Sequence, residues 1–395
     1  IVSRRDFGKL GFMHLLDESG KIQLYLKKEV LGDEMEKLSL YDIGDFVEAK
    51  GIVTKTKTGE ISVEVSDIRM LTKSIRPLPE KWAGLKDEEE RLRKRYLDFI
   101  LNPDVKDIFL KKDRFWNSMR NFMKQKGFVE VETPVLEIAT GGADATPFKT
   151  HHNALDIDVY LRISMGELWQ KRLMVGGFAK TFEIGRQFRN EGMSKEHLQD
   201  YTQMEFYWAY ADYEKGMELV EDLYKHVVHQ TFGTYTFEVF GHAIDFEKEW
   251  ERIDYVSTVN ERFGIDVMEI SKEELINTAD KEGVEYEPYY DKWKMVDVLW
   301  KVCRKDISGP AFLIGHPVGT SPLSKRDPDN PDRVERFQVI FAGSEMGNGY
   351  SELNDPVDQE NRFKEQARKR AMGMTDAQMH DKDYVEALEY GMPQT

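Results

Sequence analysis

The stretch FEIGRQFRNEG at residues 182–192, followed after a polar loop by YTQMEFYWAY at residues 201–210, decides the fold of this chain. Both segments alternate polar and apolar residues with the period of two that is typical of β-strands. They predict a long antiparallel hairpin whose first strand carries Gln187, Arg189 and Glu191 on one face.

The second strand of this hairpin presents Gln203, Glu205 and Tyr207 on one face, and the alternate residues point into a core. A sheet surface with an arginine, two carboxylates and a phenol is densely polar for a structural face. It indicates a binding site, and the alternative is a solvated ladder of ion pairs.

A second polar patch lies at residues 344–355, SEMGNGYSELND. Asn348, Tyr350 and Glu352 share strand parity there. Gly347 and Gly349 permit a bulge or the close approach of a ligand to the backbone. The alternative interpretation is an edge strand softened by glycine.

The rest of the chain divides into an all-β part and a larger mixed part. Short strands with basic turns over residues 1–76 predict a five-stranded barrel of the oligonucleotide-binding (OB) type, with an incomplete first strand. Residues 77–104 form a linker or hinge that opens on a Pro-Leu-Pro signal, with a charged helix from about residue 86 to 100. Residues 105–395 start with an amphipathic helix to about 126, and predict an α+β domain on a mainly antiparallel sheet.

Composition limits the class of protein. The chain has 395 residues, a mean hydropathy of −0.58 and 32% charged residues, and no apolar run approaches the ~20 residues that span a bilayer. Its single cysteine, Cys303, favours a reducing, cytoplasmic setting. The net charge of −16 argues against a nucleic-acid partner, but arginine and lysine are concentrated in the first 95 residues.

Several segments in order carry a resemblance to a known family. GFVEVETP at residues 127–134 resembles motif 1 of the class II aminoacyl-tRNA synthetases, and FRNE at residues 188–191 resembles motif 2. Within that class the chain is similar to the lysyl enzymes nearly from end to end. The supporting segments are RYLD at 95–98, THHNALD at 150–156, KRLMVGGF at 171–178 and SELND at 351–355.

The resemblance implies an ATP-dependent ligase that activates L-lysine and transfers it to tRNA(Lys), with Mg²⁺ as cofactor and a homodimer formed through motif 1. Two alternatives stay open. One is an aspartyl or asparaginyl ligase with the same fold, and the other is a nucleotide- or tRNA-binding paralogue without catalysis. The second is kept open because the sequence stops at Thr395, where the family continues into the ATP-clamping motif 3. We expect little activity from a molecule that ends there.

The resemblance also assigns residues to the nucleotide. It implies that Arg189 is the catalytic residue, which bridges the substrate carboxylate and the α-phosphate, as a guanidinium fork suits two oxyanions. The other implied nucleotide contacts are Glu191 at the adenine amino group, His197 or Tyr201 beside the nucleotide, Lys195 near a phosphate, and Glu345 through Mg²⁺. Gln338 stands where many relatives carry a magnesium-binding glutamate, so binding of a second metal ion is in question.

The amino-acid site that the resemblance implies is rich in carboxylates. Its expected members are Glu205, Tyr207 and Glu352 around the ε-ammonium, Gly141 and Glu167 at the α-amino group, and Asn348 with Arg189 at the carboxylate. Three carboxylates around one small cavity repel one another unless a cation lies among them. Lysine supplies two positive charges, whereas an aspartyl enzyme needs cationic residues instead. This contrast favours lysine.

In the barrel, Phe12 and Gln23 match positions that contact anticodon bases in the resembling family. An aromatic ring suits base stacking and an amide suits base edges. Burial of Phe12 in the barrel core is the alternative. The surrounding basic residues are expected to contact phosphates.

Overall fold

The computed structural model describes residues 1–395 except 79–84, 86, 195–196 and 375. The chain forms two compact units, Ile1–Leu110 and Lys111–Thr395. Part of the predicted linker, residues 79–84 and 86, therefore lies outside the described residues.

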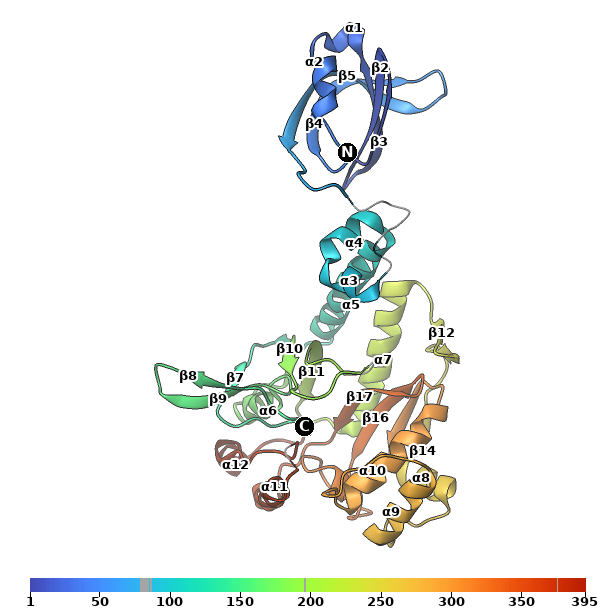
Figure 1. Ribbon diagram of the computed structural model, residues 1–395. Coiled ribbons are helices and arrows are strands. Elements are labelled where there is room, and N and C mark those ends of the chain that lie inside the picture. The colour runs from blue at the N-terminus through green and yellow to red at the C-terminus, as the bar shows by residue number, and fades with distance from the viewer. Residues whose placement is uncertain (79–84, 86, 195–196, 375) are drawn as a thin grey trace. The chain divides into compact units, whose positions relative to one another are not determined.

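The first unit is built on one five-stranded sheet with the order β1-β2-β3-β5-β4 (Figure 1). Its strands are β1 (Ser3–Phe7), β2 (Leu10–Asp17), β3 (Gly20–Lys27), β4 (Phe46–Lys55) and β5 (Ile61–Thr72). All five residues of β1 pair with β2, and β3 pairs with β5 in parallel. This sheet encloses a core that includes Met13, Leu24 and Val65, as the alternating sequence predicts.

The helices of the first unit follow the predicted segments with one difference. They are α1 (Lys28–Leu31), α2 (Glu34–Lys37), α3 (Glu88–Arg93), α4 (Arg95–Leu101) and the start of α5 (Asp104–Gln125). The single helix predicted from about 86 to 100 is divided at Lys94, whose φ of −109° and ψ of 47° are not helical. The buried carboxylate of Asp98 explains the second turn, because Arg91, Arg95 and Asn102 all donate hydrogen bonds to it.

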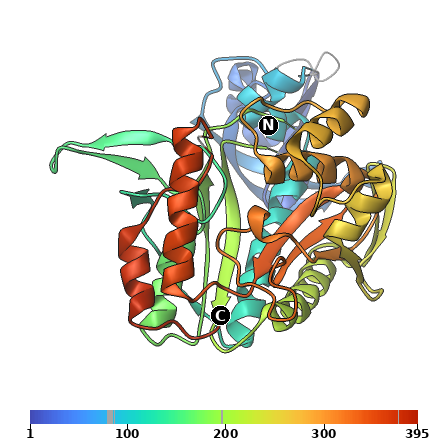
Figure 2. The ribbon, with the colours of Figure 1, turned by 90° about the horizontal axis from the view of Figure 1, so that it is seen from below.

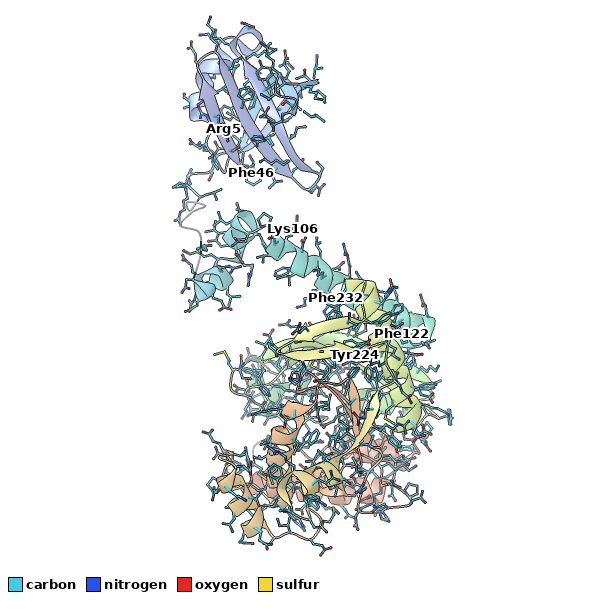
Figure 3. All side chains as sticks on the ribbon, turned by 90° about the vertical axis from the view of Figure 1, so that its right-hand side faces the viewer. Arg5, Phe46, Lys106, Phe122, Tyr224 and Phe232 are labelled. Carbon is cyan, nitrogen blue, oxygen red and sulfur yellow. The ribbon has the colours of Figure 1, made fainter. Side chains whose placement is uncertain are left out.

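The second unit contains the predicted hairpin, β10 (Lys180–Phe188) and β11 (Asp200–Trp208), paired antiparallel along its length. A short parallel strand, β6 (Val129–Glu130), joins it from the segment that resembles motif 1. The apolar face of the hairpin packs on α5 and α7 (Tyr213–Phe232) through a core that includes Phe122 and Leu223 (Figure 3).

A second sheet has the order β14-β15-β16-β17 and is mixed. Its strands are β14 (Glu251–Asp254), β15 (Ala311–Ile314), β16 (Arg336–Phe341) and β17 (Ser344–Tyr350). Strand β17 lies at the edge of this sheet, which was the alternative interpretation of residues 344–355. Its pairing with β16 contains an irregularity between Val339 and Ile340, as the bulge permitted by Gly347 and Gly349 would give. One face of this sheet contributes Ile340 to the core under α8 (Tyr255–Phe263), α9 (Lys272–Lys281) and α10 (Lys292–Cys303).

The remaining elements surround these sheets. A small sheet joins β7 (Leu136–Glu137), β9 (Ile157–Leu161) and β8 (Lys149–His152), and a two-stranded ribbon joins β12 (Thr236–Val239) and β13 (His242–Asp245). Helix α6 (Glu167–Val175) packs against α12 (Lys382–Glu389), which lies beside α11 (Pro356–Ala371), as Figure 2 shows in red. The α+β prediction with a mainly antiparallel sheet is confirmed.

Candidate active site

The polar face of the β10–β11 hairpin holds the carboxylate of Glu205 in a fixed position. Its Oε1 accepts hydrogen bonds from the backbone N–H of Met165 at 3.0 Å and from Gln203 Nε2 at 2.8 Å. Tyr207 donates its hydroxyl to Oε2 at 3.2 Å, and Gln187 Nε2 extends the network to Gln203 at 2.7 Å. The predicted face of the second strand is therefore an ordered hydrogen-bond network.

Helix α6 delivers a second carboxylate beside this face. The helix begins at Gly166, which has a left-handed φ of 66° and lies so close to Thr133 that an added Cβ would be 1.9 Å from the Thr133 hydroxyl. Only glycine fits there. This start places Glu167 in the first turn, where its Oε1 accepts hydrogen bonds from the hydroxyl of Tyr350 and, at 2.7 Å, from Lys171 Nζ.

Glu352, which follows β17, completes a group that we call the carboxylate cluster: Glu167, Glu205 and Glu352. Lys171 Nζ lies 2.6 Å from Glu352 Oε2 as well as bonding Glu167, and its side chain is fully buried. The cation expected among these carboxylates was the substrate lysine. The protein itself also supplies one, because Lys171, four residues after Glu167 on the same helix face, lies between two of them.

Burial and mutual repulsion change the acidity of the cluster. Burial, together with the charge of Glu167, raises the pKa of Glu205 to about 7. Burial also raises the pKa of Glu352 to about 8, although Lys171 opposes the shift. Burial raises the pKa of Tyr207 well above its ordinary value, so its hydroxyl stays a hydrogen-bond donor at neutral pH.

Two adjacent glycines line the Glu167 side of the cluster. The carbonyl oxygen of Gly141 accepts a hydrogen bond from the Ser164 hydroxyl at 2.9 Å, and a Cβ at this position would lie 2.6 Å from Leu168 Cδ1. Gly142 has a φ of 88°, and a Cβ there would lie 2.7 Å from Glu167 Oε2. The backbone approaches this carboxylate as closely as it does because neither residue has a side chain.

A buried ion pair between Arg162, which follows β9, and Glu183 of β10 supports the hairpin. Arg162 Nη1 donates to Glu183 Oε1 at 2.6 Å, and Thr133 donates both its hydroxyl and its backbone N–H to Oε2 of the same carboxylate. Gly185 leaves the room that this arginine needs, since a Cβ there would lie 2.6 Å from Arg162 Nη2.

The residues expected at the nucleotide are more open. Arg189 Nε donates to the carbonyl oxygen of Ile163 at 3.2 Å, and its guanidinium carbon lies 5.7 Å from the ring centre of Tyr201. No carboxylate of the described residues forms an ion pair with Arg189. Glu191 is exposed and accepts a hydrogen bond from the backbone N–H of Thr146 at 3.2 Å.

The other expected nucleotide residues are also at the surface or beside it. His197 is exposed, and its Nδ1 lies 2.8 Å from the Ser194 hydroxyl. Lys195, expected near a phosphate, lies outside the described residues. Asn348 Oδ1 accepts a hydrogen bond from Arg336 Nε at 2.8 Å.

The two residues considered for metal binding lie on neighbouring strands. Glu345 is exposed on β17 opposite Ile340, and Gln338 is buried on β16 two residues from Ile340, so both side chains share one face of the sheet. Gln338 Oε1 has no hydrogen-bond partner among the described residues. In the described ranges, no group of three or more histidine, cysteine or acidic side chains is placed to hold a metal ion.

In the first unit, Phe12 and Gln23 lie on adjacent strands, β2 and β3. The Phe12 ring stacks on Tyr25 with 5.1 Å between ring centres and 4° between planes. Gln23 is only 8% exposed; its Nε2 donates to Glu60 at 2.8 Å and its Oε1 accepts from Ser62 at 2.7 Å. Both polar atoms of the Gln23 amide therefore have hydrogen-bond partners within the protein, which fix the orientation of the side chain.

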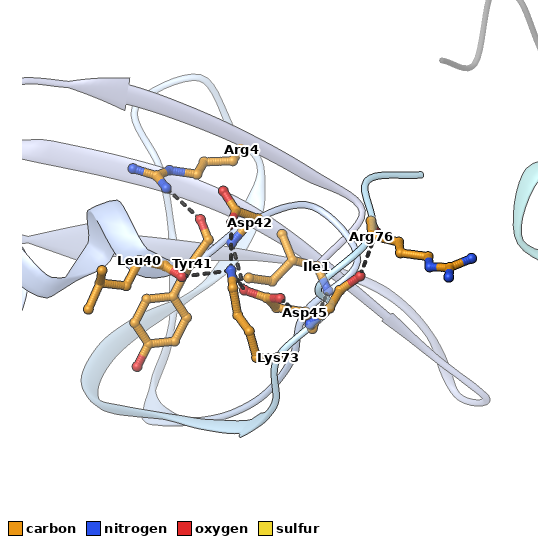
Figure 4. Close-up of polar contacts among 9 residues, drawn as sticks. Ile1, Arg4, Leu40, Tyr41, Asp42, Asp45, Lys73 and Arg76 are labelled. Atoms are coloured by element: carbon orange, nitrogen blue, oxygen red, sulfur yellow. Dashed lines mark hydrogen bonds and ion pairs between the residues drawn. The ribbon is translucent and has the colours of Figure 1, made fainter. Parts of the chain in front are cut away.

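The basic residues of this unit fall into two groups. Arg4 donates to the carbonyl oxygen of Tyr41, and Lys73 bonds Asp42 and the buried carboxylate of Asp45, which ties the strand ends together (Figure 4). These two cations have structural partners, so the expectation of phosphate contacts weakens for them. Other basic residues in the stretch 1–76 are exposed and form no ion pair among the described residues: Arg5, Lys9, Lys21, Lys55, Lys57 and Arg76.

Sequence reasoning missed Lys171, Tyr350 as a partner of Glu167, and the Arg162–Glu183 pair. For Lys171 a signal existed, because a glutamate and a lysine four residues apart on a helix commonly pair. For Arg162 and Glu183 no local pattern existed, because they are 21 residues apart and meet only through the fold.

Comparison with known proteins gives two family matches and many full-length relatives. The tRNA synthetases class II (D, K and N) match residues 87–395, and an OB-fold nucleic acid binding domain matches residues 1–71. The lysine–tRNA ligase of Halalkalibacterium halodurans is 45% identical over 398 residues, which cover this whole chain and 79% of the relative. The lysine–tRNA ligases of Thermotoga maritima and a Roseiflexus species are 45% and 46% identical over the whole chain, covering 79% and 81% of those proteins.

Proposed function

This chain belongs to the lysine–tRNA ligase family of class II aminoacyl-tRNA synthetases, and from this premise we propose that it activates L-lysine with ATP and transfers the lysyl group to tRNA(Lys). Membership makes the chain an aminoacyl-tRNA ligase with ATP as a substrate. The choice of lysine among amino acids rests on the carboxylate cluster.

The observation that carries the proposal is the close packing of buried carboxylates in the cluster, which raises their pKa values. Glu205 and Glu352 have raised pKa values because each is buried near other carboxylates, and a bound cation would relieve that repulsion. We place the ε-ammonium of lysine between Glu205, Tyr207 and Glu352, and its α-ammonium at Glu167 and the carbonyl oxygen of Gly141. An aspartate side chain would face an excess of negative charge here, since Lys171 balances only one of the three carboxylates, and an asparagine side chain would bring no cation to relieve it. Both points argue against the aspartyl and asparaginyl alternatives.

For the reacting end we propose that Arg189 holds both partners. Its guanidinium has no carboxylate partner among the described residues and lies beside Tyr201, which leaves it available to the lysine carboxylate and the α-phosphate. Asn348 adds an amide donor to the same carboxylate, Glu191 accepts from the adenine amino group, and His197 or Tyr201 lies near the nucleotide. The lysine carboxylate attacks the α-phosphorus, pyrophosphate leaves, and catalysis comes from positioning and charge stabilisation.

The donor set is compatible with Mg²⁺ bound together with the nucleotide. Glu345 offers one exposed carboxylate, and the unpartnered amide oxygen of Gln338 lies on the same face of the sheet. One carboxylate suits an ion that keeps phosphate oxygens and waters as its other ligands. When bound, Mg²⁺ would neutralise phosphate charge, with Glu345 as its protein ligand. The neutral Gln338 favours fewer ions than a second glutamate would.

For the tRNA we propose that the first unit binds the anticodon. The stacked pair of Phe12 and Tyr25 offers a flat aromatic surface, and Gln23 presents a positioned amide beside it. The unpaired cations Arg5, Lys9, Lys55 and Lys57 would contact phosphates. We further propose the domain limits 1–76, 77–104 and 105–395.

We also propose a homodimer formed through the motif 1 segment at residues 127–134, and a cytoplasmic location, which the single buried Cys303 favours. The described helices include none with the length and apolar character needed to cross a membrane. Sedimentation analysis of the purified full-length protein tests the dimer.

The proposal is tested by amino-acid-dependent ATP–pyrophosphate exchange with the full-length protein, followed by aminoacylation of tRNA(Lys). We expect lysine alone among the twenty amino acids to drive rapid exchange. Exchange driven best by aspartate or asparagine would contradict the proposal. No exchange with any amino acid, together with retained ATP binding, would support a non-catalytic paralogue instead.

A further inference from the structure

Lys171 is a buried cation within the proposed lysine site that the function above does not use. It lies one helical turn after Glu167 on α6, and its side chain has no exposed surface. Its Nζ donates to Glu167 Oε1 at 2.7 Å and lies 2.6 Å from Glu352 Oε2. It therefore links α6 to the segment that follows β17.

The surroundings of Lys171 keep its ammonium charged and in place. Burial by itself lowers the pKa of a lysine, but the carboxylates of Glu167 and Glu352 outweigh this effect and raise it. The rings of Tyr350 and Tyr384 lie 5.4 Å and 5.9 Å from the Nζ atom. The site therefore contains a permanent positive charge supplied by the protein.

This charge changes the electrostatic balance of the site. Glu167, Glu205 and Glu352 together carry three negative charges when ionised, and Lys171 cancels one of them. Two negative charges remain, which match the two ammonium groups of lysine, while the lysine carboxylate faces Arg189. A ligand with a single ammonium group would leave a buried carboxylate without a counter-charge, which is costly.

Lys171 also determines which carboxylate oxygens remain available. Glu167 uses Oε1 for both Lys171 and Tyr350, so its Oε2, on the Gly142 side, is the oxygen left for a ligand. Glu352 faces Lys171 through Oε2, 2.6 Å from the Nζ atom, and its Oε1 accepts no hydrogen bond from the described residues. Each of these carboxylates thus keeps an acceptor for a ligand donor.

We infer that Lys171 is a positioning residue that sets the charge and the orientation of the amino-acid site, so that a ligand with two ammonium groups completes it. The inference rests on the proposed function. Lys171 acts through Glu167 and Glu352, and the rings of Tyr350 and Tyr384 enclose its ammonium group. Glu205 and Tyr207 face the same ligand from β11.

The experiment compares Lys171→Met and Lys171→Arg with the wild-type full-length protein in lysine-dependent ATP–pyrophosphate exchange. We expect Lys171→Met to raise the KM for lysine about 30-fold or more, with kcat and the KM for ATP within about 3-fold. The reason is that Glu167 and Glu352 lose the cation that balances their charge and orients them for their charge-assisted bonds to the ligand. Lys171→Arg, which keeps the charge, should recover part of the loss. Arg172→Met is the matched control, since it removes a cation from the next position of α6 whose partner is Asp381.

A double variant keeps the test decisive if Lys171→Met fails to fold. Lys171→Met combined with Glu352→Gln removes both charges of one pair, so the cost of burying an uncompensated carboxylate is avoided. Against the Glu352→Gln background, loss of Lys171 should raise the lysine KM by less than about 3-fold, since the surplus charge is gone.

Three outcomes overturn the inference. The first is a folded Lys171→Met with a lysine KM within about 3-fold of wild type, which is the result expected of a purely structural ion pair. The second is an equal loss in kcat, ATP affinity and thermal stability, and the third is an undiminished loss in the double variant. The wild-type measurement distinguishes failure of this inference from failure of the proposed function. If ATP–pyrophosphate exchange by the wild-type protein did not depend on lysine, the proposed function would be wrong.

Discussion

The carboxylate cluster and the nucleotide side of the site are built in opposite ways. In the cluster, Glu167 and Glu205 are held by several protein donors before any ligand arrives. On the nucleotide side, Arg189 and Glu345 have no ion-pair partner among the described residues, and Glu191 has a single backbone contact. This difference indicates that the fold preorganises the side chains that select the amino acid. The side chains expected at the nucleotide have few protein partners and are available to bind ATP.

The largest effect is expected for a substitution of Arg189 on the nucleotide side. We expect Arg189→Ala to lower kcat/KM for exchange by about 10³-fold, because a preorganised cation at the reacting phosphate is lost. Stability should barely change, since its side chain makes one hydrogen bond to the residues that the structure describes. Arg186→Ala, an exposed arginine paired with Asp200 on the same hairpin, is the matched control and should retain activity. Equal losses in both variants would remove the special role of Arg189.

Glu205→Gln tests the carboxylate cluster. Loss of one charged partner should raise the KM for lysine about 10²-fold and leave the KM for ATP nearly intact. Exchange kinetics at varied lysine and varied ATP measure the two effects separately. Glu191→Gln should give the reciprocal pattern, and a Glu205→Gln enzyme with an unchanged lysine KM would rule out this assignment.

The first unit provides a third prediction, separate from both halves of the active site. Phe12→Ala should raise the KM for tRNA about 10-fold through lost base stacking, and leave ATP–pyrophosphate exchange unchanged. Phe46→Ala, which removes an aromatic ring that is 68% exposed on β4, is the control in the same unit. If both substitutions weaken aminoacylation alike, the Phe12–Tyr25 stack is not the base-binding surface.

A fourth prediction concerns the pH dependence of lysine binding. Free Glu205 and Glu352 hold protons below their pKa values of about 7 and about 8, and both must ionise to receive an ammonium ion. The KM for lysine should therefore fall as pH rises from 6 to 8, by at most about tenfold per unit for each proton released. Glu352→Gln should remove the upper part of this dependence. A KM for lysine that stays flat over this range would contradict the raised pKa values.

The elements were more predictable from sequence than their internal contacts. The strand period placed the β10–β11 hairpin and the polar face of its second strand correctly, because alternation along one strand is a local property. On the first strand it was right for Gln187 alone, since β10 ends at Phe188 and Arg189 and Glu191 follow it. The division of the predicted helix at Lys94 was missed, since it depends on the network around Asp98. The spacing of Glu167 and Lys171 was visible, but whether Lys171 turned toward solvent or toward Glu352 depended on a segment 181 residues away.

The same limit applies to the first unit. Aromatic and amide residues on adjacent strands could be recognised as candidates, but the engagement of Gln23 by Glu60 required the packed barrel. Likewise, the sequence alone could not separate Lys73, bonded to Asp45, from Lys55 and Lys57, for which the described part of the chain offers no such partner. Charge patterns report composition along the chain, whereas ion pairs are a property of the tertiary structure.

The bare backbone of Gly142 limits how this enzyme could be redesigned. Its left-handed φ and the short distance from its missing Cβ to Glu167 Oε2 leave no room for any larger residue beside the proposed α-amino position. Substitution of Gly142 therefore cannot enlarge the site to accept lysine derivatives that are altered at the α-nitrogen. Derivatives altered at the far end of the side chain, where Tyr207 and Glu352 can be exchanged for smaller residues, are the practical route to new substrates.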